Sequence, residues 1–131
     1  MYSQKNIQTK LAKGLLDLIV LQLLEKRPMH GYELIVTIRK SFGVYFGAST
    51  VYPLLSSLEK KKCVQSEWTT DSERPRKVYK LTKEGKATLE CTSETLNLIF
   101  SSMHTFNPQI RTAMKQGHAD EEISKVCNMR L

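Results

Sequence analysis

The fold is decided by the stretch from Ala48 to Leu81, which reads ASTVYPLLSSLEKKKCVQSEWTTDSERPRKVYKL. Apolar residues in its first half recur at helical spacing: Val51, Leu54, Leu55 and Leu58. This spacing predicts a helix with one buried face. The second half alternates apolar and polar residues over Val64–Thr70 and Val78–Leu81, on either side of a charged turn that contains a proline. The stretch therefore predicts a helix followed by a β-hairpin.

The face of this helix that points away from the core is small, polar and cationic. It comprises Thr50, Pro53, Ser57, Lys60 and Lys61. Such a surface suits contact with a DNA duplex, in which Thr50 and Ser57 could reach base edges and Lys60 either a base or a phosphate. Tyr52 fits a phosphate contact and a purely structural role equally well. Ser49 is the predicted N-cap, and Pro53 is expected close to the helix start, because deeper inside it would break the hydrogen-bond ladder.

The basic charge of the chain is concentrated in and just after this stretch. The formal net charge is +7, and residues 60–86 hold nine Lys or Arg against four Asp or Glu, which is +5 of that total. Clustered positive charge beside an exposed helix indicates a polyanionic partner, most simply DNA. Arg74, Arg76 and Lys77 in the turn are the predicted phosphate contacts. The alternative is a solvated basic surface that only keeps the protein soluble.

The N-terminal part of the chain predicts two helices. The first is expected over about Lys10–Glu25, and it is apolar around so much of its circumference that its own domain and a partner chain would both have to cover it. The second is expected over Gly31–Ser41, after a connector formed by Pro28–Gly31. Lysines precede the apolar run Leu15–Leu24, as in a signal peptide, but polar residues interrupt the run and no small cleavage-site residues follow it. We therefore expect a cytoplasmic protein without a membrane segment.

The composition offers no candidates for catalysis, metal binding or disulfides. The chain is 40% hydrophobic and 25% charged, as in ordinary soluble proteins. Cys63, Cys91 and Cys127 lack CxxC spacing and lie in apolar segments, which predicts reduced, buried thiols. The three histidines are far apart in the sequence, and phosphate-loop or nucleophile motifs are missing, so we expect no enzyme, metal or cofactor. Trp68, the single tryptophan, is interpreted as a packing residue.

The C-terminal part predicts a helix that pairs with a second chain. Thr82 is its predicted N-cap, and apolar residues then recur every seven positions. One heptad position holds Leu89, Leu96, Met103 and Ile110, and a second holds Thr92, Ile99, Phe106 and Ala113. This seam predicts a homodimer held by Leu89, Leu96, Ile99, Met103 and Phe106. At Pro108 we expect a kinked helix or two helices end to end, and beyond it a last short helix over Glu121–Arg130.

Helix, loop, helix and hairpin in this order predict a winged helix-turn-helix. The predicted fold class is mainly α with a small β-hairpin. The predicted domains are a winged helix-turn-helix DNA-binding domain over residues 1–82 and a C-terminal helical dimerisation region over 83–131. The second helix of the pair would lie in the major groove, and the hairpin would reach the flanking backbone or the minor groove.

Four segments of the chain resemble the PadR family of winged-helix transcriptional regulators. They are KGLLDLIVLQLL at 13–24, PMHGYEL at 28–34, STVYPLLSSLEK at 49–60 and SERPRKVYKLTKEGK at 72–86. Residues matching the family's second helix, recognition helix and wing are Gly31, Tyr32, Thr50, Tyr52, Pro53, Arg74, Pro75, Arg76, Lys77 and Tyr79. Together with the exposed helix face, the predicted DNA-binding residues are Ser49, Thr50, Tyr52, Pro53, Ser57, Lys60, Arg74, Arg76 and Lys77.

The resemblance implies a homodimeric repressor that binds double-stranded DNA at a pseudo-palindromic operator. It also implies release of that operator by a small, commonly aromatic, effector. The chain departs from the family at Lys62 and Glu73, where relatives usually have glycine. At Lys62 the recognition helix would have to end on a left-handed non-glycine residue, or end differently. The alternative function is a winged-helix module that binds protein and does not bind DNA specifically.

Overall fold

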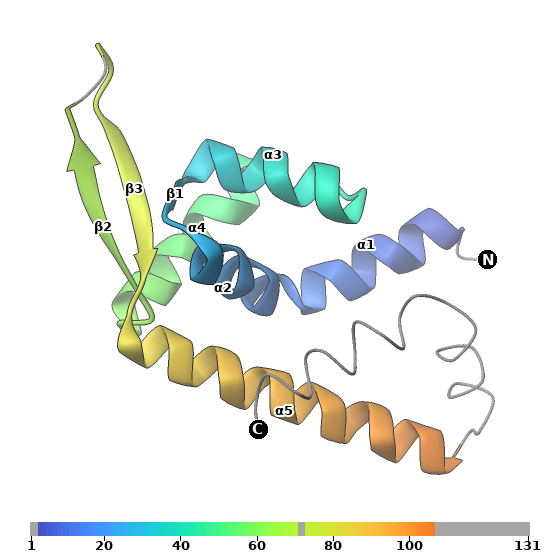
Figure 1. The fold of residues 1–131 in the computed structure, drawn as a ribbon. Coiled ribbons are helices and arrows are strands. Elements are labelled where there is room, and N and C mark those ends of the chain that lie inside the picture. Colours follow the sequence, from blue (N-terminus) through green and yellow to red (C-terminus); the bar gives the residue numbers. More distant parts are fainter. Residues whose placement is uncertain (1–2, 71–72, 107–131) are drawn as a thin grey trace. The chain divides into compact units, whose positions relative to one another are not determined.

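The computed structural model describes residues 3–70 and 73–106 of the 131-residue chain. The chain forms two compact units, Met1–Leu89 and Glu90–Leu131. The element order in the described part is α1, α2, β1, α3, α4, β2, β3 and α5 (Figure 1). It is mainly α-helical with a small antiparallel sheet of strand order β1-β3-β2, which agrees with the predicted fold class.

The single helix predicted over Lys10–Glu25 is wrong, because the structure has two helices there. They are α1, Gln4–Gly14, and α2, Leu16–Lys26. The chain leaves helical geometry at Leu15, whose φ is −105° and ψ 10°, and the preceding Gly14 is a poor helix former. The predicted two-sided burial applies to α2, in which seven residues are buried, whereas Leu11 of α1 is 63% exposed.

The predicted connector before the second helix contains a strand, β1, of two residues, Met29–His30. It pairs antiparallel with β3, with Met29 opposite Tyr79 and His30 opposite Val78. The helix that follows, α3, covers Gly31–Phe42, one residue beyond the predicted end. It ends at Gly43, whose φ of 68° is left-handed and is adopted by glycine at no steric cost.

The predicted recognition helix is α4, Ala48–Lys60, and it packs against α3. The predicted N-cap, Ser49, is wrong. Gly47 is the N-cap residue, without a side-chain cap, and its carbonyl oxygen accepts the first helical hydrogen bonds from Thr50 N and Val51 N at 3.0 Å each, so Ser49 lies inside the first turn. Pro53 was expected close to the helix start, but it is the sixth residue of α4 and lies inside the helix, where it supplies no N–H to the hydrogen-bond ladder. On the inward face Val51, Leu55 and Leu58 are buried, in the same core as Leu34 and Ile38 of α3, whereas Leu54 is half-buried.

The hairpin consists of β2, Val64–Thr69, and β3, Arg76–Leu81, each within two residues of its predicted bounds. It projects beyond the helices in Figure 1. Side chains alternate between its two faces. The face that we call the α4-facing face holds Val64, Ser66, Trp68, Lys77, Tyr79 and Leu81. The opposite, outer face holds Gln65, Glu67, Thr69, Arg76, Val78 and Lys80.

The last described helix, α5, covers Lys83–Phe106. Thr82 is its N-cap, as predicted, because the Thr82 hydroxyl accepts from Gly85 N at 2.9 Å. The same hydroxyl donates to the Lys62 carbonyl oxygen at 2.6 Å, which fastens the helix start to the end of α4. The expectations for Pro108, Ile110, Ala113, Cys127 and Glu121–Arg130 lie outside the described residues. Within the described ranges, each helix is too short or too polar to cross a bilayer.

The end of α4 confirms the first of the two expectations for Lys62, a left-handed non-glycine residue at the end of the helix. Lys62 has a φ of 63°, and its N–H donates to the Glu59 carbonyl at 3.0 Å, while the Cys63 N–H donates to the Leu58 carbonyl at 2.9 Å. These two bonds form a Schellman motif, in which the left-handed residue is usually glycine.

We expect Lys62→Gly to stabilise the protein by about 1 kcal/mol, because glycine removes the steric cost of the left-handed conformation. The midpoint of urea unfolding measures this change. Lys61→Gly is the matched control, since Lys61 has a φ of −80° and glycine there only adds flexibility to the unfolded chain. Equal responses of the two variants would contradict the strain at Lys62.

Candidate DNA-binding surface

The outward face of α4 presents all six residues predicted to read DNA from this helix. Ser49, Tyr52, Pro53 and Lys60 are exposed, and Thr50 and Ser57 are half-exposed. Ser49, Pro53, Ser57 and Lys60 follow one another at three- and four-residue spacing, which aligns them along one side of the helix. The structure therefore brings these predicted residues together on one surface.

Tyr52 makes a structural contact and is also partly exposed, so both roles considered from the sequence, packing and phosphate contact, are compatible with its position. Its ring lies against Gly31 at the start of α3, where a Cβ atom would be 2.5 Å from the Tyr52 Cε1 atom. Any side chain at residue 31 would displace the ring. Tyr52 is nevertheless 41% exposed, so it also contributes to the outer surface of α4.

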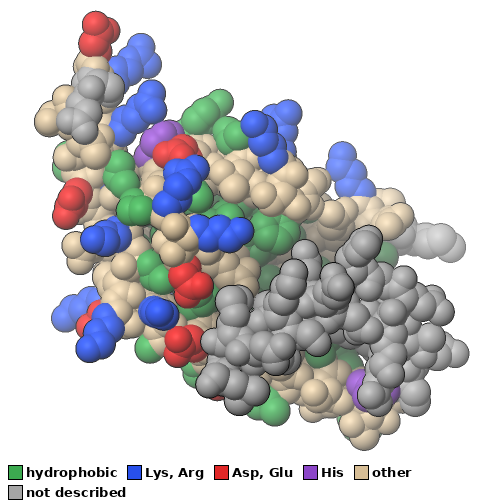
Figure 2. Space-filling model, in the orientation of Figure 1, with side chains coloured by type: hydrophobic (Ala, Val, Ile, Leu, Met, Phe, Trp, Pro, Cys, Tyr) green, Lys and Arg blue, Asp and Glu red, His purple; other side chains and the backbone are tan. Residues whose placement is uncertain are grey.

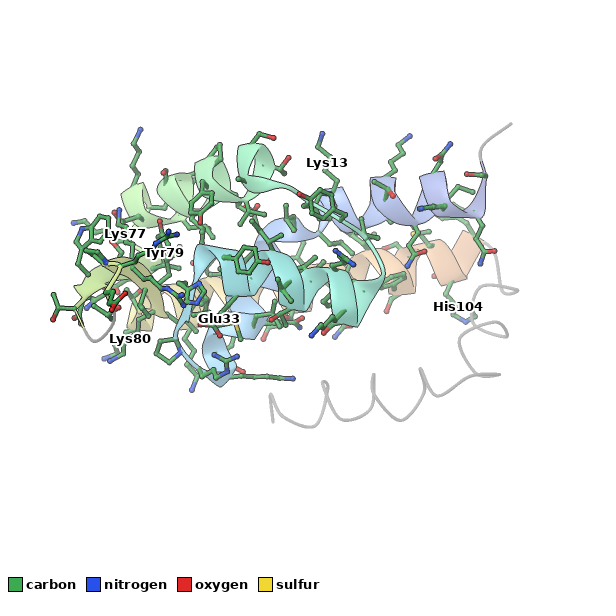
Figure 3. All side chains as sticks on the ribbon, turned by 90° about the horizontal axis from the view of Figure 1, so that it is seen from above. Lys13, Glu33, Lys77, Tyr79, Lys80 and His104 are labelled. Atoms are coloured by element: carbon green, nitrogen blue, oxygen red, sulfur yellow. The ribbon has the colours of Figure 1, made fainter. Side chains whose placement is uncertain are left out.

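On the α4-facing face of the hairpin, Glu59 connects α4 to both strands. Ser66 Oγ donates to Glu59 Oε2 at 2.5 Å, and Lys77 Nζ lies 3.8 Å from Glu59 Oε1. The Lys77 ammonium also lies 5.7 Å from the centre of the Tyr79 ring, a cation–π contact (Figure 3). Burial, followed by the negative charge of Glu59, raises the pKa of the Tyr79 hydroxyl. Lys77 is thus held against its own domain by a carboxylate.

On the outer face, Arg76 meets the start of α3. Arg76 Nη1 lies 3.3 Å from His30 Nε2, and His30 Nδ1 accepts from Glu33 N at 3.3 Å, which caps α3. Glu33 also accepts from Arg27 Nη1 at 2.7 Å, and this hydrogen bond is the main reason that the pKa of the Glu33 carboxyl is lowered. These contacts join the end of α2, the start of α3 and the first residue of β3.

Arg76 and Lys77 were predicted as one group of phosphate contacts, but they lie on opposite faces of β3. Figure 3 shows the same alternation, with Lys77 and Tyr79 on one side of the hairpin and Lys80 on the other. Arg74 lies in the exposed segment between the strands. Lys and Arg side chains are distributed along the hairpin and over the neighbouring helices, with acidic side chains among them (Figure 2).

Several surface residues were missed or misjudged from the sequence. Tyr45, in the loop before α4, is 67% exposed. Trp68 is also 67% exposed, so its interpretation as a packing residue is wrong. Cys91 is exposed, against the prediction of a buried thiol, whereas Cys63 is buried as predicted. Period-two alternation places Trp68 and Val64 on the same face, but only the base of that face is covered by the domain.

The predicted dimer seam lies along α5, and its exposure increases toward the helix end. Leu89 is buried, Leu96 is half-buried, and Met103 is exposed. Ile99 is 51% exposed and Phe106 is 89% exposed. Within the described part of α5, the apolar surface that a second chain could cover therefore begins at about Leu96.

Solved structures with this fold are transcriptional regulators. A PadR family regulator from Eggerthella lenta has 30% identity and a TM-score of 0.69, over 74% of this chain and 85% of that chain. A PadR family regulator from Clostridium difficile has 30% identity and a TM-score of 0.64, over 70% of this chain and 97% of that chain. Bacillus subtilis PadR, solved in complex with operator DNA, has 27% identity and a TM-score of 0.53, over 57% of this chain and 43% of that chain.

The sequence comparison agrees with the structural one. No curated protein sequence matches the chain. The model of the transcriptional regulator PadR-like family, however, matches residues 20–91, which is more than half of the chain and extends from α2 through the hairpin into α5. The chain belongs to the PadR-like family of transcriptional regulators.

Proposed function

We propose that this regulator binds DNA sequence-specifically, with α4 in the major groove and the hairpin on the flanking backbone. The observation that carries the proposal is the continuous outward row from Ser49 to Lys60 on α4, beside a basic hairpin. The operator complex of Bacillus subtilis PadR, at 27% identity, supports a DNA partner for this chain. In this arrangement Thr50, Ser57 and Lys60 face base edges, and Tyr52 faces the backbone.

We propose that the cations on the two faces of the hairpin contact different phosphates. A hairpin that enters the minor groove has a sugar–phosphate strand on each side. Arg76 on the outer face then contacts a phosphate of one DNA strand. Lys77 on the α4-facing face leaves Glu59 and contacts a phosphate of the other DNA strand. Arg74 at the hairpin end adds a third contact. Such contacts position the protein without reading the sequence.

The proposal includes a homodimer held through α5, which doubles the DNA-reading surface. Support comes from the apolar residues at heptad spacing that α5 leaves exposed, above all Ile99 and Phe106. A two-fold dimer prefers a pseudo-palindrome whose half-sites are separated by about one helical turn or a multiple of it. We extend the proposal to repression in the cytoplasm and to release by a small aromatic effector, in line with the family resemblance.

Selection of duplexes from a random pool by the purified full-length protein tests this function. We expect enrichment of a pseudo-palindromic sequence. Failure to enrich any sequence would instead favour the protein-binding module. A reporter promoter that carries the selected sequence should be expressed more strongly in cells that lack the protein, if the regulator is a repressor.

Replacing Arg76 by alanine tests the hairpin. We expect all duplexes to be bound about tenfold more weakly, and the slope of log affinity against log salt to flatten by about 0.9 per lost phosphate contact, because fewer counterions are released. Fluorescence anisotropy of a labelled duplex over a salt series measures both.

Lys86→Ala is the control for Arg76→Ala, since it makes the same change of charge on exposed α5 surface outside the hairpin. We expect its salt slope to stay close to that of the unmodified protein. Unchanged affinity and slope in Arg76→Ala would exclude the outer face of the hairpin from DNA contact.

A further inference from the structure

Trp68 lies at an unusual place for a large apolar side chain. It is on β2, one pair before the end of the ladder, and 67% of its surface is exposed. Tryptophan buries a large area when it is covered and is therefore enriched at binding surfaces. An exposed tryptophan near the end of a projecting hairpin indicates a partner that covers it.

The direction of the side chain follows from its strand neighbours. Ser66 lies two residues before Trp68 and bonds Glu59 of α4, and Lys77 is the cross-strand partner of Trp68 and pairs with the same carboxylate. Residues 66, 68 and 77 therefore share the face directed at α4. At Val64 that face is buried by the domain, whereas at Trp68 it is open.

The charge around Trp68 decides which partner fits. Its cross-strand neighbour on the same face is Lys77, and Arg74 lies in the segment that joins the strands. A basic rim around an aromatic ring matches a nucleic acid backbone, in which phosphates meet the cations and the flat sugars and bases meet the ring. A purely apolar protein partner would have to desolvate these basic side chains, whereas DNA phosphates would pair with them.

We propose that Trp68 is a DNA-contacting residue, which packs on the sugars of the backbone strand that passes between α4 and the hairpin. This inference rests on the proposed function and adds a residue to it. Trp68 would thus supply apolar contact on the same side on which Lys77 supplies charge.

The test uses the fact that Trp68 is the single tryptophan of the chain, so its fluorescence reports on this side chain alone. The full-length protein is titrated with the duplex recovered by selection, and acrylamide quenching of tryptophan emission is measured before and after saturation. Acrylamide is uncharged, so the negative potential of DNA does not repel it. We expect efficient quenching in the free protein and at least about threefold weaker quenching in the complex, because the ring is covered.

Substitutions test whether the contact contributes to affinity. We expect Trp68→Ala to bind the duplex about tenfold more weakly, and Trp68→Phe to retain most of the affinity. Gln65→Ala, an exposed position on the outer face of the same strand, should change affinity less than about twofold. Circular dichroism confirms that each variant is folded, which we expect because residue 68 is exposed.

The possible outcomes separate this inference from the function on which it rests. Duplex binding with unchanged acrylamide quenching, or with equal affinities of Trp68→Ala and the unmodified protein, would overturn the role of Trp68 and leave DNA binding intact. Weak quenching in the free protein would also overturn it, since another part of the assembly would then cover the ring. An absence of duplex binding by the unmodified protein would overturn the proposed function and this inference together.

Discussion

Ile99→Asp is expected to convert the protein to monomers and to weaken binding of the palindromic duplex by at least about a hundredfold. Ile99 is half-exposed on α5 and occupies the second position of the heptad seam, between Met103 and Leu96. A carboxylate placed there in a dimer would be buried opposite its own copy, and an unpaired buried charge costs about 3–5 kcal/mol. DNA affinity falls when the dimer dissociates, because a dimer that binds two linked half-sites has an affinity about 10² to 10⁴ times that of a monomer on one half-site.

Sedimentation equilibrium over a concentration series measures the association of Ile99→Asp, and anisotropy measures its DNA affinity. Position 99 is preferable to position 96 for this test, since Leu96 is half-buried and a charge there could unfold the subunit. Ser101→Asp is the matched control, because Ser101 is exposed and lies outside both heptad positions. An intact dimer of Ile99→Asp would refute the seam, and monomers of Ser101→Asp would show that any charge on α5 prevents association.

The features that the sequence predicts well are those carried by strong local patterns. The buried face of α4 follows from Val51, Leu55 and Leu58 at helical spacing, and the polar face then follows by exclusion. Thr82 is a good N-cap by residue type, and the structure uses it. The separation of Arg76 from Lys77 was not predicted, because the strand was expected to begin at Val78, whereas β3 begins at Arg76 and its adjacent residues point to opposite faces.

Features that depend on distant partners could not be predicted in this way. β1 has two residues, too few for any periodicity, and exists because β3 offers it a pairing edge. The contacts of Arg76 with His30 and of Lys77 with Glu59 join residues that only the folded domain brings together. The same reason explains Trp68, because a strand pattern gives the face of a side chain but not how far the neighbouring helix covers that face.

The junction of α4, the hairpin and α5 is held by a close approach that also depends on tertiary structure. Gly85, in the first turn of α5, lies against the Cys63 carbonyl group, and a Cβ atom there would collide with that carbonyl oxygen and lie 2.7 Å from Leu81 Cδ1. The Cys63 backbone has little freedom to move, since its N–H donates to the Leu58 carbonyl and its carbonyl accepts from Thr82 N at 3.1 Å. This backbone position therefore requires glycine.

Gly85→Ala is expected to destabilise the protein by about 3 kcal/mol, the upper end for overpacking, because fixed backbone rather than a side chain must yield. The better helix propensity of alanine, worth about 1 kcal/mol, offsets only part of this. Urea unfolding measures the change, with Gly14→Ala as the control. Nothing lies within 4 Å of a Cβ at Gly14, so the same substitution there should stabilise the protein or leave it unchanged. If both alanine variants unfold at the same urea concentration as the unmodified protein, α5 does not press on Cys63, and the hairpin is not anchored through this contact.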